Sequence, residues 1–168
     1  MNPRQIFGLQ FLLSLVVFAL LARWYVSPRL ARLSREEAIQ PLLVPHVFRH
    51  LGMVFLLPTV VGHALPSAFA VPAAYGDLAA GLLALTALAA LRARARVALA
   101  LTWLFSLEGL VDLVNALYQG VTHDVALGAA YYIPIVAVPA LLLTHVMIVR
   151  ILLEGVGARA HLPAPSHL

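Results

Sequence analysis

The chain has no cysteine and no lysine, and charged side chains of either sign are scarce. The absence of cysteine excludes disulfides, thiolate nucleophiles and cysteine-ligated zinc or iron–sulfur centres. Charged residues make up 11% of the 168 positions and hydrophobic residues 62%, whereas soluble domains have about 25% and 45–50%. A chain this short has too much surface to hide that apolar excess in a core. The composition therefore predicts an integral protein of the cell membrane, with lipids as its solvent.

Five apolar runs are each long enough to cross a bilayer, which takes roughly 20 mainly apolar residues. The predicted spans are residues 6–26, 46–63, 75–91, 97–118 and 125–153. We therefore predict an all-α fold, a polytopic integral membrane helical bundle of about five transmembrane helices in one domain, residues 1–159. The first run is longer than a signal-peptide core and lacks a good cleavage site, so we expect it to be retained. Residues 160–168 are predicted to be a disordered cytoplasmic tail.

Arginine supplies all the basic side chains and sets the predicted orientation. Ten of the 11 arginines fall on one side if five helices alternate, and only Arg4 falls on the other. Because positive charge concentrates on the cytoplasmic side of membranes, we predict the N-terminus outside and the C-terminus inside. The net charge of +4 is thus distributed between apolar runs, which argues against a nucleic-acid partner.

Three segments carry local structural signals. The run Ser34–Glu37 (Ser-Arg-Glu-Glu) matches a helix capping box and predicts a short interfacial helix ahead of Pro41. The outer link, residues 64–74, is apolar but contains prolines, so we expect it to dip irregularly into the membrane boundary. Pro134 and Pro139 lie inside the fifth run and predict a kink there.

The fourth run places polar side chains along one line of a helix. These residues are Glu108, Asp112, Asn115 and Gln119. Their offsets of 0, 4, 7 and 11 put them within an arc of roughly 60°. The line begins near the predicted middle of the bilayer and climbs about 16 Å to the outer face, at 1.5 Å per residue. We expect a half-channel or pocket that opens to the outside.

Two acids in this position are costly and therefore informative. A charged acid at the centre of a bilayer costs a few kcal/mol, so such residues are expected to face the bundle interior and to be functional. We predict Glu108 and Asp112 as an acid/base pair. The alternative is that they are polar contacts that hold helices together.

Other polar residues near the outer end extend the predicted site. Tyr131 and Tyr132 differ by about 100° around a helix, so one of them is expected to face inward. His63 ends the second run and Asp77 begins the third, where an acid also suits a helix cap. The predicted ligand-binding residues are Asn115, Gln119, Tyr131, Tyr132, His63 and Asp77.

The histidines of the inner half suggest a second, weaker hypothesis. His46 and His50 are four residues apart, with Arg49 between them, and His145 is predicted at a similar depth. His50 and His145 on facing helices could ligate a b-type haem, with Arg49 on a propionate. The simpler interpretation, in which they bond to neighbouring helices, is preferred, so no metal and no cofactor are predicted.

Three functional classes fit this pattern. The first is a binding site or enzyme for a small amphipathic or lipid-like molecule, with Glu108 as the buried acid or base. The second is an accessory subunit of a membrane complex, in which small residues and acids contact a partner protein or a second copy. The third is proton or ion transport along the line from Glu108 to Asp112. No phosphate-binding glycine loop, nucleophile elbow or nucleic-acid motif is present.

Overall fold

The computed structural model describes residues 1–123 and 125–160, with side chains described as far as Glu154. All the regular secondary structure in this part of the chain is helical, and it contains no strand. The elements, in order, are α1 (Pro3–Leu21), η1 (Ala22–Val26), α2 (Ser27–Leu30), α3 (Arg35–Val47), η2 (Phe48–Leu56), α4 (Pro58–Val61), α5 (Ser67–Arg92), α6 (Ala98–Thr122), η3 (Gly128–Tyr131), η4 (Ile133–Ala137) and α7 (Val138–Ala160). Here η1 and η4 are π-helical, while η2 and η3 are 3₁₀ helices.

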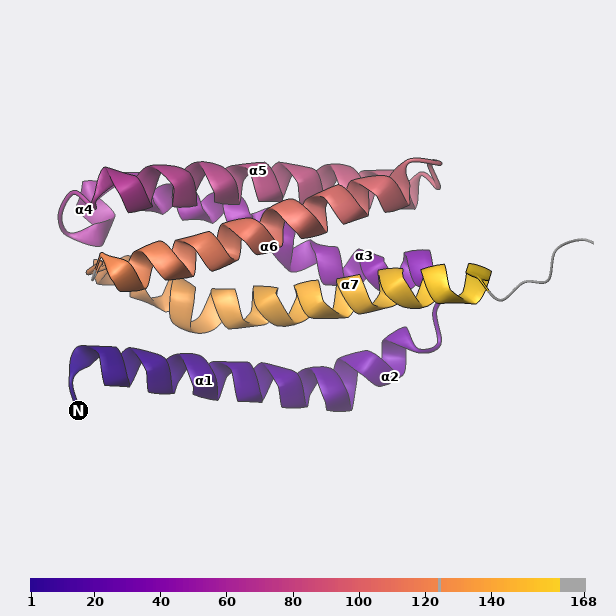
Figure 1. Ribbon diagram of the computed structural model, residues 1–168, viewed down its shortest axis with the longest axis horizontal. Coiled ribbons are helices and arrows are strands. Elements are labelled where there is room, and N and C mark those ends of the chain that lie inside the picture. Colours follow the sequence, from indigo (N-terminus) through magenta and orange to yellow (C-terminus); the bar gives the residue numbers. More distant parts are fainter. Residues whose placement is uncertain (124, 161–168) are drawn as a thin grey trace, which may run out of the picture.

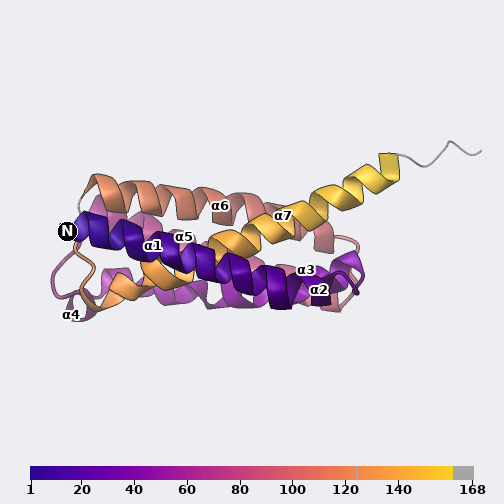
Figure 2. The ribbon, with the colours of Figure 1, turned by 90° about the horizontal axis from the view of Figure 1, so that it is seen from below.

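Five continuous helical segments are long and apolar enough to cross a membrane, which confirms the predicted number and the all-helical class. They are Pro3–Leu30, Arg35–Leu56, Ser67–Arg92, Ala98–Thr122 and Gly128–Glu154. The segments run along the long axis of the molecule (Figure 1), and α5 packs mainly against α6 and against the α3–η2 segment. The first segment lies on the outside of the bundle, below the other helices in Figure 1 and in front of them in Figure 2. Helix α1 contacts α7 and η4 and buries none of its own residues.

Apolar packing is concentrated towards the two ends of the bundle. At the end with the loop that joins α5 to α6, a cluster around Ile39, Phe105 and Ile148 is fully buried. At the end with α4, a smaller cluster surrounds Val61 and Phe69. The buried charged residues lie between these two clusters along each helix. A third apolar cluster, of Leu113, Val138 and Leu141, lies beside them. The core is therefore apolar at both ends, and the buried charges share its middle with this small apolar cluster.

The second span begins earlier than predicted. The capping box is confirmed, because the Ser34 hydroxyl accepts from the Glu37 backbone and the Glu37 carboxylate accepts from the Ser34 backbone. The helix that follows is not a short interfacial one, since it passes through Pro41 and continues to Leu56. Proline does not end a helix whose freed backbone groups are sheltered by neighbouring helices. The predicted start at residue 46 was therefore about three turns too late.

The third span also extends beyond its prediction. Helix α5 begins at Ser67 and runs through Pro72, so the predicted irregular link at 64–74 is largely helical. Asp77 consequently lies well inside the helix, and its interpretation as a cap was wrong. In the fifth segment, Pro134 lies in the π-helical turn η4, which is the distortion found where a kink was expected. The predicted tail at 160–168 lies outside the described residues, apart from Ala160 at the end of α7.

The capping box predicts a measurable stability difference. Replacing Ser34 with Ala removes the side-chain acceptor at the helix start and should lower the free energy of unfolding by about 1 kcal/mol. Titration of the purified protein with a denaturing detergent measures this loss. Ser67→Ala is a matched control, because α5 begins without a side-chain cap. Equal effects of the two substitutions would contradict a role for the box.

Candidate functional site

Arg49 lies at the centre of the buried polar region. Its side chain is only 1% exposed. Its Nε donates to Asp77 Oδ1 of α5 at 2.7 Å, and its Nη1 donates to the Gly109 carbonyl oxygen of α6 at 3.1 Å. Its Nη2 donates to Asp112 Oδ2, also of α6. One guanidinium therefore joins η2, α5 and α6 through charge-assisted hydrogen bonds, which are stronger than neutral ones.

The 3₁₀ geometry of η2 explains why Arg49 can point inward. The buried residues of this element are Arg49, Gly52 and Phe55, at intervals of three. In a 3₁₀ helix, side chains three residues apart eclipse one another, whereas on an α-helix they would drift around the axis. The change from α3 to η2 therefore aligns these three residues on one face towards α5.

Three glycines make room for the three charged side chains. A Cβ at Gly52 would overlap the Asp77 carboxylate, and a Cβ at Gly76 would overlap that of Asp112. A Cβ at Gly109 would lie 2.8 Å from Arg49 Nη1. Each of the three helices thus contributes one charged residue and one glycine. The charge of each fits against the glycine of a neighbour, so the ion cluster and the close packing of the helices require each other.

The charges within this cluster do not balance. One guanidinium faces two carboxylates, and a third acid, Glu108, lies one turn before Asp112 on α6. Glu108 is half-buried, and its Oε2 is a buried atom with no hydrogen-bond partner within the described residues. With its carboxyl groups ionised, the cluster has an excess of negative charge. It can be neutralised by protons or by a bound cation.

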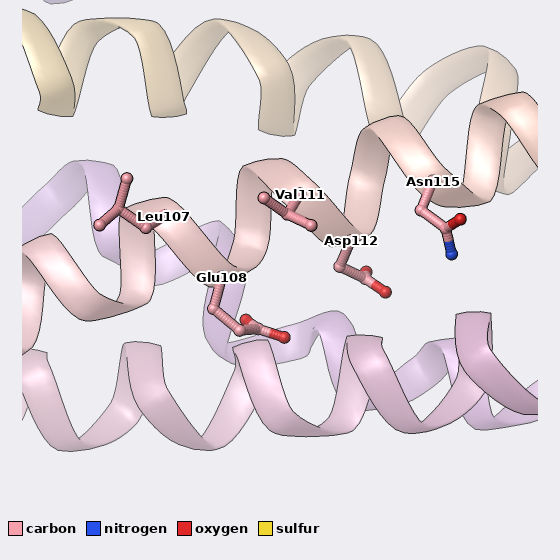
Figure 3. A pocket seen from close by; sticks show the side chains of 5 residues that line it. All are labelled: Leu107, Glu108, Val111, Asp112 and Asn115. Atoms are coloured by element: carbon pink, nitrogen blue, oxygen red, sulfur yellow. The ribbon is translucent and has the colours of Figure 1, made fainter.

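The acids open onto a hollow on the surface of α6. It has a volume of about 430 Å³ and is lined by Leu107, Glu108, Val111, Asp112 and Asn115. Figure 3 shows Glu108, Asp112 and Asn115 projecting from the same side of α6, towards α5. The structure thus brings together three of the four residues of the predicted polar line. Gln119 does not line this hollow.

A second, narrower cavity of about 200 Å³ reaches the ion cluster from another side. It lies between η2 and the start of the fifth segment, and its lining includes Arg49 and Asp77 beside apolar residues such as Leu51 and Leu141. Both neighbouring stretches are irregular helices, η2 and η4. Arg49 and Asp77 thus line this cavity, whereas Asp112, which accepts from Arg49, lines the hollow on α6.

Two histidines form the floor of the polar region. His46 and His145 are fully buried, and their rings lie 4.2 Å apart between centroids, beside the ring of Phe105. The Thr144 hydroxyl donates to backbone carbonyls and lies 2.9 Å from His46 Nε2, which therefore donates to it. Neither ring nitrogen of His145 has a hydrogen-bond partner in the described part of the chain. These nitrogens give the interior uncommitted polar groups next to Arg49.

The predicted pairing of His50 with His145 is not found. His50 is exposed and bonds the carbonyl oxygen of Val47, while His46 occupies the position against His145. Rings in direct contact leave no space for a haem between them. Among the described residues, no group of three or more histidine or acidic side chains is arranged to hold a metal ion.

The remaining predicted residues are scattered. Asp77 lies in the ion cluster with Arg49 and not at the outer end of the bundle, where it was predicted. The Tyr131 hydroxyl donates to Gln10 of α1 at 2.6 Å. Tyr132 is 69% exposed, and His63 is exposed beyond α4. The tyrosines and His63 are therefore not brought to the acids of α6.

The most important residue that sequence reasoning missed as part of the site is Arg49, which it placed at the edge of a span. The glycines were missed as well. A usable signal exists in the spacing, since each charged residue has a glycine one or three positions away: Arg49 with Gly52, Asp77 with Gly76, and Asp112 with Gly109.

Comparison with known proteins identifies a family without an assigned activity. A family model described as a domain of unknown function (DUF8737) matches residues 6–153, which include nearly all of the five spans. The chain therefore belongs to this family. No curated protein and no solved structure matches it.

The glycine contacts predict a strong effect of one methyl group. Gly76→Ala forces a Cβ into the Asp112 carboxylate and should lower the free energy of unfolding by about 3 kcal/mol or more. Gly8→Ala in α1 is the control, because a Cβ there meets nothing within 4 Å. That substitution should leave stability unchanged or raise it, since alanine is the better helix former. Comparable losses in both variants would refute the interlocking of glycines and charges.

Removing the central cation should be equally severe. Arg49→Met leaves two buried carboxylates without their counter-charge and should cost about 3–5 kcal/mol of unfolding free energy. Arg96→Met, at an exposed position, controls for the loss of a positive charge. If denaturing-detergent titrations gave the same small change for both, Arg49 would not be the centre of the fold.

Proposed function

We propose that this member of the DUF8737 family is a multi-pass membrane protein that binds a small amphipathic molecule with a cationic head group in the hollow on α6. The observation that carries the proposal is the free Oε2 of Glu108, a buried acceptor beside a carboxylate cluster with too little positive charge. A protonated amine on the ligand supplies both the missing charge and the missing donor.

The lining of the hollow supports an amphipathic ligand over a simple ion. Leu107 and Val111 are 60% and 70% exposed and flank the acids on the same helix. Asn115 adds an amide that can both donate and accept. A ligand with a polar head and an apolar body can therefore place its head on Glu108 and Asp112 while its body remains against apolar side chains.

Entry from the side is favoured over passage along the axis. The fully buried apolar cluster around Phe105 lies at one end of the polar region, and the cluster around Phe69 lies at the other. The hollow, in contrast, opens on the outer surface of α6. These features support binding from the lipid phase more than proton or ion transport through the bundle.

We further propose that the N-terminus faces outside and the C-terminus the cytoplasm, because the exposed arginines other than Arg4 gather at the end of the bundle opposite Met1 (Figure 1). Conversion of the ligand remains part of the same hypothesis. Glu108 and Asp112, one turn apart, would then exchange a proton with the bound head group as acid and base.

A photoreactive long-chain alkylamine tests the proposal. In nanodiscs, we expect ultraviolet labelling to fall on the peptide that contains Leu107 and Val111, and dodecylamine to compete better than dodecanol or dodecanoate. Glu108→Gln should weaken labelling about tenfold or more, because hydrogen bonds to a charged group contribute about 1.5–3 kcal/mol.

Glu154→Gln provides the matched control, since this exposed acid at the far end of α7 pairs with Arg150. It should label like the unmodified protein. Labelling that does not distinguish the amine from the alcohol, or that persists in Glu108→Gln, would overturn the proposal.

A further inference from the structure

A second candidate surface lies far from the hollow, at the end of the bundle that carries α2 and the loop between α5 and α6 (Figure 1). Three stretches lie at this end of the molecule: residues 23–35, residues 92–96 and the second half of α7, whose last turns extend beyond the bundle (Figure 2). Their described arginines are Arg23, Arg29, Arg32, Arg35, Arg92, Arg94, Arg96 and Arg150. The acids at this end are Glu36, Glu37 and Glu154. Positive charge therefore predominates.

Most of this positive charge is not used within the fold. Arg35 pairs with Glu36, and Arg150 pairs with Glu154. Arg29 donates to the carbonyl oxygen of Tyr25. Arg94 interacts electrostatically with the carboxylate of Glu37. The other four arginines, at positions 23, 32, 92 and 96, form no ion pair or side-chain hydrogen bond with the described residues. Their guanidinium groups are available to an external anion.

The backbone at Arg94 gives independent support. Its φ of +52° lies in the left-handed region, which for residues other than glycine costs about 1–2 kcal/mol. Glycine is the residue that relaxes such a turn. Arginine and not glycine nevertheless occupies this turn, and its side chain is exposed at the tip of the loop.

Aromatic residues place this surface at a lipid boundary. Trp24 and Tyr25 on η1, just before α2, are 58% and 56% exposed. Exposed tryptophan and tyrosine at the end of an apolar span suit the level of lipid head groups. The combination of free arginines and an aromatic belt fits a lipid surface better than an acidic protein.

We call the exposed arginines of residues 23–35 and 92–96 the arginine collar. We propose that it is a binding site for anionic phospholipid head groups. Guanidinium groups bind phosphate oxygens through paired hydrogen bonds, and arginines beside an anionic leaflet each contribute to membrane attraction. The collar does not depend on the hollow of α6, so each proposal can be tested and rejected without affecting the other.

Lipid exchange measured by native mass spectrometry tests the collar. The intact protein in detergent is titrated with phosphatidylglycerol or with phosphatidylcholine of the same chains. We expect preferential retention of phosphatidylglycerol, and a preference that decreases with salt as the charges are screened. Arg94→Gln should weaken phosphatidylglycerol binding about fivefold, and neutralising residues 92, 94 and 96 together should weaken it by about a hundredfold.

Two further variants separate a binding role from a structural one. Arg4→Gln removes the same charge at the opposite end and should leave the preference unchanged. Arg94→Gly removes the charge while relaxing the left-handed backbone, so it should keep or raise thermal stability and still weaken phosphatidylglycerol binding about fivefold, as Arg94→Gln does. Equal retention of both lipids by the unmodified protein, or equal losses in Arg94→Gln and Arg4→Gln, would overturn the proposal.

Discussion

The buried guanidinium of Arg49 is the interaction on which the middle of this bundle depends. Removing an ion from water costs several kcal/mol, and this cost is recovered only when the geometry and the remaining hydrogen bonds are good. Arg49 meets these conditions with Asp77 on α5 and with Asp112 and the Gly109 carbonyl on α6. One side chain therefore fixes the positions of three helices relative to one another. Apolar packing alone would not specify these positions so closely.

This constraint also explains the irregular backbone. An α-helix through residues 48–56 would carry Arg49, Gly52 and Phe55 progressively around its axis, and the glycine would no longer face Asp77. The 3₁₀ winding keeps all three in line, although runs of this length are uncommon. Because glycine has no side chain, the neighbouring carboxylates and guanidinium occupy the space that a larger residue would fill at these positions. The pairing of Arg49 with the two carboxylates and the 3₁₀ winding of η2 thus belong to the same packing arrangement.

The sequence predicted what depends on local composition and failed where long-range pairing decides. Hydropathy located five spans, and helical periodicity placed Glu108, Asp112 and Asn115 on one face, where they line a common hollow. Treating prolines as helix ends displaced two boundaries, and this error moved Arg49 to an interface and turned Asp77 into a cap. The weaker hypothesis matched His50 with His145 by depth alone, whereas His46 lies against His145 in the structure. The change of winding after Val47 has no signature in periodicity. Partners 28 and 63 residues apart leave no periodic trace.

The position of Asp112 connects the two hollows. Asp112 lines the hollow on α6 and accepts a hydrogen bond from Arg49. Arg49 in turn lines the cavity beside η2. A cationic head group on Glu108 and Asp112 would compete with Arg49 for the same carboxylate. A weaker Arg49–Asp112 pair would leave Arg49 with Asp77 on α5 and the Gly109 carbonyl on α6 as its partners. Occupation of one hollow would then alter the shape of the other, because Arg49 and Gly52, which both line the second cavity, belong to the element that Arg49 anchors.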